Sequence, residues 1–219
     1  MKKVIALTFI MAVSTAMCTN LFAQESDQLR TSATVITDLF VGNKSNALNF
    51  GNILVGSSKF LDSENPGGNY VDATASGTGG GVDGLTGDEE LGFVSIETNG
   101  VVNITVRLPE NLKSSSDNTL PVDWTGGGQN GSGYNIRAGV ADFTDNTAPT
   151  GTISMMLGRN DWVLAATDNG NPIVEATSVD IGAAGGEIFV VVGGQVNAGT
   201  NQPTEVYQGN IQVTATIQN

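Results

Sequence analysis

The apolar residues of this chain recur at every second position over short segments, and no segment sustains the 3.6-residue apolar period of an amphipathic helix. The clearest alternation runs from residue 209 to residue 219, where one face is apolar and the other is rich in Gln and Thr. The apolar members are Ile211, Val213, Ala215 and Ile217. Clusters of Gly, Asn and Asp separate such segments and favour turns between strands. The sequence therefore predicts an all-β protein.

The best candidate for a hairpin joins residues 91–98 to residues 101–108 through Asn99-Gly100. Asn-Gly suits a two-residue type I′ turn, because both positions of that turn need positive φ. With this turn as the pivot, one apolar face contains Leu91, Phe93, Val102, Ile104, Val106 and Leu108. Further strands are predicted over residues 33–41, 47–55, 120–124, 151–157, 162–166 and 187–192.

Roughly seven to nine short strands joined by turn clusters are typical of an antiparallel β-sandwich of the immunoglobulin-like kind. A barrel is the structural alternative. Two segments are expected to be long loops. Residues 62–90 contain eight glycines and seven acidic residues, and residues 125–133 are nearly all Gly, Asn, Gln and Ser. Segments with so little to bury favour loops over further strands.

Two lysines follow the first Met, and the apolar run after them, residues 4–13, is too short to span a bilayer. This layout, with Ala23 as the small residue before a cut, is typical of a secretory signal peptide. We therefore expect cleavage after Ala23 and a single β-sandwich domain over residues 24–219. The protein is then secreted, periplasmic or on the cell surface. The alternative is lipidation of Cys18, for which the preceding residue, Met17, is bulky.

The chain contains no His, and its single Cys, Cys18, lies inside the predicted signal peptide. Catalysis by Ser-His-Asp or Cys-His groups is therefore excluded, as are zinc sites built from thiolate and imidazole. The remaining acid–base candidates, Asp88, Glu89 and Glu90, lie in the glycine-rich segment rather than at a rigid strand end. We expect a protein that is not an enzyme.

The net charge of the chain limits the classes of partner that it is expected to bind. After removal of the two leading lysines, 7 basic residues stand against 22 acidic ones, which gives a net charge of −15. Such a surface repels nucleic acid and anionic lipid, so neither is expected as a partner. No later apolar run has the length of a membrane span, and the mature chain is not expected to insert into a membrane.

Two oxygen-rich clusters are weak candidates for a calcium site, the one possible cofactor. The first contains Asp142, Asp145 and Asn146, and the second contains Asp168, Asn169 and Asn171. Carboxylate and carbonyl oxygens on loops suit calcium, but Asp and Asn are also ordinary turn residues. Trp124, at the entrance to residues 125–133, is a possible contact for a carbohydrate, whereas Trp162 shares a strand face with Leu164 and is expected to be buried.

Several segments resemble a secreted bacterial family known only as a domain of unknown function. The likeness covers residues 33–217 and rests on the order and spacing of several motifs, which include the strand at residues 33–37 and the segment that ends in Leu108-Pro109. The longest motifs are Leu48-Asn49-Phe50-Gly51-Asn52-Ile53 followed by Val55-Gly56-Ser57, then Ile188-Phe189-Val190-Val191-Val192-Gly193-Gly194 with Asn201-Gln202, and finally Tyr207-Gln208-Gly209-Asn210-Ile211-Gln212-Val213-Thr214. The resemblance implies an immunoglobulin-like sandwich akin to bacterial pilin subunits. The chain departs from those pilins at its end, Ile217-Gln218-Asn219, which has no penultimate aromatic residue.

The predicted function is that of a non-catalytic secreted or cell-surface structural protein, a pilin-like (fimbrial) or adhesin-like subunit. It would associate with itself or with other surface subunits by pairing strands at a sheet edge, over residues 33–41 or residues 207–217. The candidate assembly residues are Ala33, Val35, Leu39, Val41, Tyr207, Ile211, Val213 and Ile217. The alternative is an extracellular carbohydrate- or calcium-binding β-sandwich module.

Overall fold

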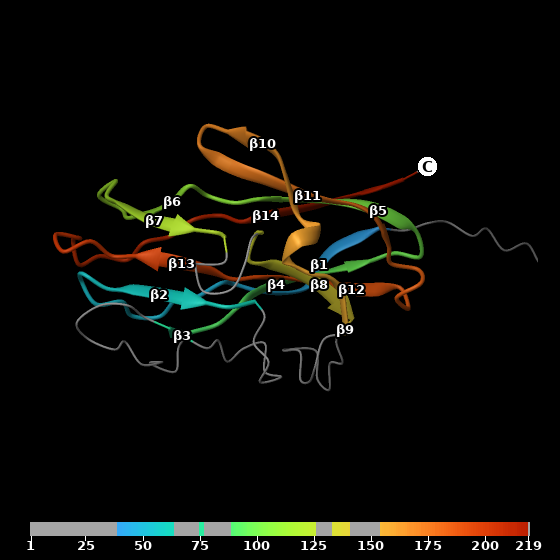
Figure 1. Ribbon diagram of the computed structural model, residues 1–219, viewed down its shortest axis with the longest axis horizontal. Coiled ribbons are helices and arrows are strands. Elements are labelled where there is room, and N and C mark those ends of the chain that lie inside the picture. The colour runs from blue at the N-terminus through green and yellow to red at the C-terminus, as the bar shows by residue number, and fades with distance from the viewer. Residues whose placement is uncertain (1–38, 64–74, 77–88, 126–132, 141–153, 219) are drawn as a thin grey trace, which may run out of the picture. The chain divides into compact units, whose positions relative to one another are not determined.

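The computed structural model describes residues 39–63, 75–76, 89–125, 133–140 and 154–218 (Figure 1). The chain divides into two compact units, Met1–Ile36 and Thr37–Asn219, and all of the described residues lie in the second. They form fourteen strands and one 3-10 turn, Arg159–Asp161. Every strand pair among them is antiparallel, and the strands form three open sheets rather than a closed barrel. The predicted all-β sandwich is confirmed.

The first sheet has the order β1-β4-β12-β8-β9, and the second has the order β10-β11-β5-β14. The strands of the first are Phe40–Asn46, Gly92–Glu97, Glu187–Val192, Ile136–Val140 and Ser154–Leu157. Those of the second are Val163–Asp168, Asn171–Asp180, Val101–Arg107 and Gln212–Ile217. A third sheet, β3-β2-β13-β7-β6, contains Ala75–Ser76, Ser58–Leu61, Gly194–Asn197, Thr119–Asp123 and Asn111–Lys113.

The first two sheets pack face to face across the main core. Strands β4, β12 and β8 contribute Ile96, Ile188, Val190, Val192, Ile136 and Ala138. Strands β5 and β11 contribute Val102, Ile104, Val106, Val174, Ala176 and Val179. The three side chains from β5 occupy every second position of that strand, as the sequence pattern predicts for a strand with one buried face.

Strand β12 is buried on both faces, which explains its unbroken apolar run. Its other face joins a second cluster, in which Phe189 and Phe93 meet edge to face with ring centroids 6.2 Å apart. Leu61 and Val196 of the third sheet belong to the same cluster. A strand that contributes to two cores has no position that must be polar, and the predicted bounds 187–192 are confirmed.

The predicted hairpin at Asn99-Gly100 is wrong. Strand β4 pairs with β1 and β12, whereas β5 pairs with β11 and β14, so the turn passes from one sheet to the other. Neither Asn99 nor Gly100 has positive φ. The single apolar face is wrong too, because Leu91 and Phe93 belong to the second cluster while the β5 side chains fill the main core. Apolar alternation on two strands does not reveal whether they share a sheet.

The true Asn-Gly hairpin lies between β10 and β11, at Asn169-Gly170. Asn169 has φ of 52° and Gly170 has φ of 83°, the positive pair that a type I′ turn needs. Strand β11 itself was not predicted, although it is the longest of the described strands. Its register shifts between Ala176 and Val179, and Ser178 has φ of 58°. This bulge breaks the alternation from which a strand is predicted.

Some of the other predicted strands are confirmed and others are not. Strands at 120–124 and 209–219 are confirmed as β7 and β14. Residues 47–55 form no strand, because Gly51 has positive φ and only a bridge from Asn49 to Glu90 forms there. Residues 33–38 of the expected strand 33–41, most of segments 62–90 and 125–133, and residues 151–153 lie outside the described part. Trp162 is buried as expected, but Leu164 is exposed.

The two Asn-Gly turns within the described residues should respond differently to the same substitution. We expect Gly170→Ala to lower the free energy of unfolding by about 1–2 kcal/mol, because a Cβ at positive φ is strained. The new Cβ would also meet the carboxylate of Glu110. Gly100→Ala, at a position without positive φ, costs clearly less. Urea unfolding of both variants measures this; equal losses would contradict the assignment of the hairpin to residues 169–170.

Candidate functional site

The edge of the second sheet formed by β14 is the first candidate site. In the described part of the chain, no strand pairs with the outer edge of β14, which has β5 on its inner side. Its apolar face, predicted from the sequence, points toward the main core but is only half-buried. Val213, Ala215 and Ile217 are therefore incompletely covered, whereas the facing residues of β5 are fully buried.

A groove of about 1250 Å³, lined by both polar and apolar residues, begins beside this edge. Ile211 and Val213 line it from the β14 side, and Val190, Val192 and Phe93 line it from the first sheet. The segment between β1 and β2 and the segment leading into β14 complete its walls. The groove thus opens the interior between the sheets at the place where the apolar face of β14 is half-covered.

The rim of the groove carries exposed apolar side chains on a fixed backbone. Val206 is 75% exposed and Val55 is 48% exposed. The rim segment is held by a backbone pair between Lys113 and Gln208, with N···O distances of 2.8 and 2.9 Å. The amide Nδ2 of Asn118 donates to Glu205 at 3.1 Å. An apolar rim that is tied down in this way is prepared to bind without ordering first.

The assembly candidates divide between the groove and its surroundings. Val213 and Ile217 lie on β14 as predicted, and Ile211 immediately precedes that strand. The Tyr207 hydroxyl donates to the carbonyl of Pro203 at 2.9 Å, and its ring lines the groove. Leu39 packs against the main core, and Val41 of β1 is exposed. Ala33 and Val35 lie outside the described residues.

Trp124 is not the exposed ligand contact that the sequence suggested. Its side chain is 4% exposed, and its indole Nε1 donates to the carbonyl of Pro109 at 2.6 Å. The absence of a side chain at Gly194 lets the ring approach that backbone closely. The ring forms part of the groove floor instead. Its place at the start of a Gly-rich segment gave no sign of this burial.

The described calcium candidates take turn and ion-pair roles. Asp168 forms an ion pair with Arg107 at 2.5 Å, and Asn169 donates to Asp168 at 3.0 Å. The side-chain oxygen of Asn171 accepts the backbone N–H of Glu110 at 2.9 Å. Asp142, Asp145 and Asn146 lie outside the described residues. Within the described part, no three acidic, Cys or His side chains group to hold a metal ion.

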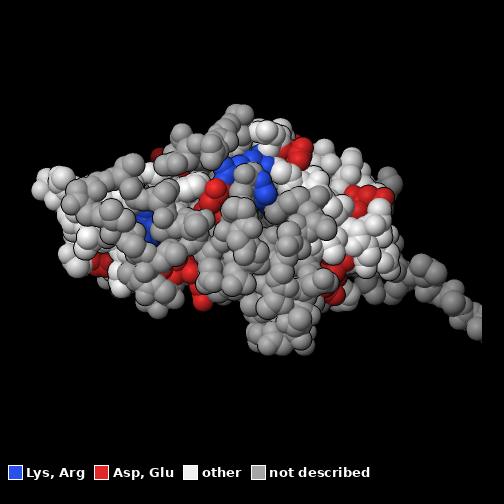
Figure 2. Space-filling model, turned by 60° about the horizontal axis from the view of Figure 1, so that its bottom comes forward, with Lys and Arg blue, Asp and Glu red and all other residues white. Residues whose placement is uncertain are grey.

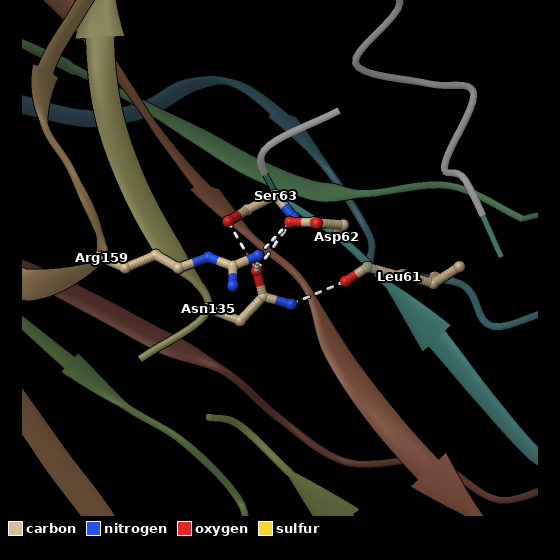
Figure 3. Close-up of polar contacts among 5 residues, drawn as sticks. All are labelled: Leu61, Asp62, Ser63, Asn135 and Arg159. Atoms are coloured by element: carbon tan, nitrogen blue, oxygen red, sulfur yellow. Dashed lines mark hydrogen bonds and ion pairs between the residues drawn. The ribbon is translucent and has the colours of Figure 1, made fainter. Parts of the chain in front are cut away.

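A buried polar cluster, which sequence reasoning missed, joins the sheets around Asn135 (Figure 3). The Asn135 side-chain oxygen accepts two hydrogen bonds from Ser63, one from its backbone N–H at 2.9 Å and one from its hydroxyl at 2.6 Å. The same oxygen accepts a third hydrogen bond from Nη2 of Arg159 at 3.2 Å. Its Nδ2 donates to the carbonyl of Leu61 at 2.7 Å. The Arg159 guanidinium also forms an ion pair with Asp62. No local pattern marks this cluster, because its members are far apart in sequence.

Three charged side chains, Arg137, Arg159 and Asp62, lie at or near the Asn135 cluster. Arg137 lies close enough to the cluster for the pKa of its guanidinium to be lowered, first by burial and then by the positive charge of Arg159; Asp62 opposes the shift. Figure 2 shows basic atoms concentrated in one area of the surface, with acidic atoms beside them. Asp62 lies beside Arg159 and Arg137 and so supplies a carboxylate that compensates part of their positive charge.

A second buried ion pair accounts for one of the carboxylates considered for catalysis. Glu89 contacts Lys59 at 2.6 Å, and both side chains are almost fully buried. Nζ of Lys59 also donates to the carbonyl of Asn52 at 2.6 Å. The pair fastens β2 to the segment before β4. Removing one partner would leave a buried charge uncompensated.

Comparison with known proteins does not assign this chain to a family. No protein-family model, no curated protein and no solved structure matches this chain. Among the described residues, no helix is both long and apolar enough to cross a membrane.

The Asn135 cluster should be worth several kcal/mol of stability. We expect Asn135→Ala to lower the free energy of unfolding by about 3 kcal/mol or more, because Ser63 and Leu61 lose buried hydrogen-bond partners. Asn201→Ala, at an exposed position, serves as the control and should change stability by less than about 0.5 kcal/mol. Thermal and urea unfolding measure both. A loss below about 1 kcal/mol in Asn135→Ala would contradict the role of the cluster.

The rim of the groove should respond to acid. Hydrogen bonds from Ser114 and Asn118 lower the pKa of Glu205 below its usual value. A lowered pKa stabilises the fold above the unfolded-state pKa, and this contribution disappears as the pH falls through the folded-state pKa. NMR titration of the Glu205 carboxyl should show the low pKa and its rise toward normal in Asn118→Ala. An unchanged pKa in that variant would contradict the hydrogen bond.

Proposed function

We propose that this protein is a non-catalytic structural subunit of a secreted or cell-surface assembly, and that its subunits associate by strand pairing at β14. The observation that carries the proposal is the outer edge of β14, with which no described strand pairs, beside a groove that contains apolar side chains from both sheets. The proposal includes export with cleavage of a signal peptide after Ala23, and it agrees with the resemblance to a secreted pilin-like family. The alternative is a carbohydrate- or calcium-binding module, and its carbohydrate form loses the exposed Trp124 as a contact because that side chain is buried.

Strand addition at β14 would complete both hydrogen bonding and burial. Gln218 donates its backbone N–H to Val101 of β5 at 2.8 Å. Because directions alternate along an antiparallel strand, the amides of Thr214 and Thr216 also face β5. Those of Val213, Ala215 and Ile217 then face the open edge, ready to pair with an added strand.

The groove supplies the apolar part of such an interaction. Alternate side chains of an added strand would point into the space between the sheets, beside Val213 and Ile211. Each aliphatic side chain buried there would contribute roughly 1.5–3 kcal/mol before the cost of association. Backbone pairing gives the register, and the apolar side chains that line the groove favour apolar residues at the positions of the added strand that face them.

The edge can be blocked without disturbing the rest of the sheet. Ala215→Pro removes one outward N–H and leaves the ladder from β14 to β5 intact, since proline is tolerated on the open side of an edge strand. We expect the purified mature protein to form assemblies in light scattering and negative-stain microscopy. We expect Ala215→Pro to remain monomeric with a similar melting temperature.

Ala215→Ser keeps the amide and is the matched control, which should assemble like the parent. Two outcomes would contradict the proposal. One is a parent protein that stays monomeric at every concentration. The other is an Ala215→Pro variant that assembles as well as Ala215→Ser.

A further inference from the structure

We propose that the strand received at β14 is β10 of a second copy, so that copies of this chain join edge to edge into one continuous sheet. The inference rests on the proposed function and names the partner strand of the same site. Both strands belong to the second sheet, of which β10 and β14 are the two edges. Each is six residues long.

Strand β10 is unusually exposed for a strand of apolar composition. Val163 and Leu164 are each 54% exposed, and the three residues that follow are exposed as well. Figure 1 shows the β10–β11 hairpin projecting away from the rest of the second sheet. An exposed apolar edge strand is a template for pairing with another chain.

Neither edge carries the charges that normally prevent such pairing. Strand β14 contains no charged residue, and the only one in β10 is Asp168, next to the turn and paired with Arg107. Of the four edges of the other two sheets, β1 and β6 contain Lys44 and Lys113, whereas β9 and the two-residue β3 are also uncharged but shorter than β10 and β14. In a chain with a net charge of −13, two neutral strands are places where copies can meet without electrostatic repulsion.

The strand directions of the second sheet also match. Successive neighbours from β10 to β14 are antiparallel, so the two edges of this four-stranded sheet run in opposite directions. Two copies in the same orientation therefore bring β10 and β14 together antiparallel, which continues the pattern of the sheet. The contact is heterologous and repeats without closing.

The geometry of a growing sheet predicts the form of the assembly. Neighbouring strands are rotated by about 20–25°, so a copy that adds four strands should turn by roughly 80–100° relative to the previous one. The result is a helical filament with about four copies per turn. Helical reconstruction from electron micrographs would report this rotation.

Cysteine cross-linking tests which edges meet. In a chain with Cys18→Ser, Ala165→Cys in one copy and Thr214→Cys in a second, size-tagged copy should form a mixed cross-linked dimer with a short bis-maleimide. Both positions are exposed and lie on the paired strands. Dimers of Ala165→Cys alone or of Thr214→Cys alone would show a two-fold contact between identical edges and would overturn the inference.

Assembly of point variants separates this inference from the proposed function. We expect Leu164→Asp to reduce the assembled fraction at least tenfold, and Ala183→Asp, at an exposed residue of the turn after β11, to leave it unchanged. If Leu164→Asp assembles normally while Val35→Asp does not, the strand at residues 33–41 is the partner. The inference about β10 is then wrong and assembly at β14 stands. A parent that never assembles would overturn both.

Discussion

The burial of β12 on both faces is the constraint on which the described structure depends. One face of the strand contributes Ile188, Val190 and Val192 to the core between the first two sheets, and the other contributes Phe189 and Val191 to the second cluster. Each fully buried aliphatic or aromatic side chain contributes about 1.5–3 kcal/mol. Five such residues in a row make β12 the largest local contribution to packing. Strands β4 and β8 pair directly with β12, and β1 and β9 pair with those two strands in turn.

At its end β12 must pass into the third sheet, and polar contacts make this possible. Gly193 donates its N–H to the carbonyl of Asn135 at 2.9 Å, and a Cβ at this glycine would collide with the carbonyl of Leu61. The backbone N–H of Asn135 in turn donates to the carbonyl of Trp124 at 2.7 Å. Asn135 thus provides hydrogen-bond partners for buried polar groups of several segments. Apolar packing alone would leave these groups without hydrogen bonds. The floor of the groove, which includes Trp124, is fixed by the same contacts.

The sequence predicted the all-β class and several strands correctly, but it missed others, among them β2, β8, β11 and β13, and it predicted the pairing poorly. Each outcome has a physical reason. Alternation identified β5, β14 and the apolar run of β12 because each has a regular relation to a core. It failed for β11, where a bulge at Ser178 breaks the period, and it placed the hairpin at the wrong Asn-Gly. Which Asn-Gly turns back within a sheet depends on tertiary packing, since Asn99 and Asn169 have the same local chemistry. The β14 edge residues were predicted from alternation, but the groove and the Asn135 cluster join residues from distant segments that no local pattern relates.

The same distribution of charge connects stability with assembly. A net charge of −13 opposes contact between copies over most of the surface. Three basic residues of the described part form internal or local ion pairs, namely Lys59–Glu89, Arg159–Asp62 and Arg107–Asp168. Their charge is then compensated within one copy and does not attract a second, equally acidic copy. Contact between copies must instead use neutral surface, where backbone pairing and apolar burial supply the free energy. The edges of the second sheet meet this requirement, and specificity follows because repulsion elsewhere disfavours other contacts.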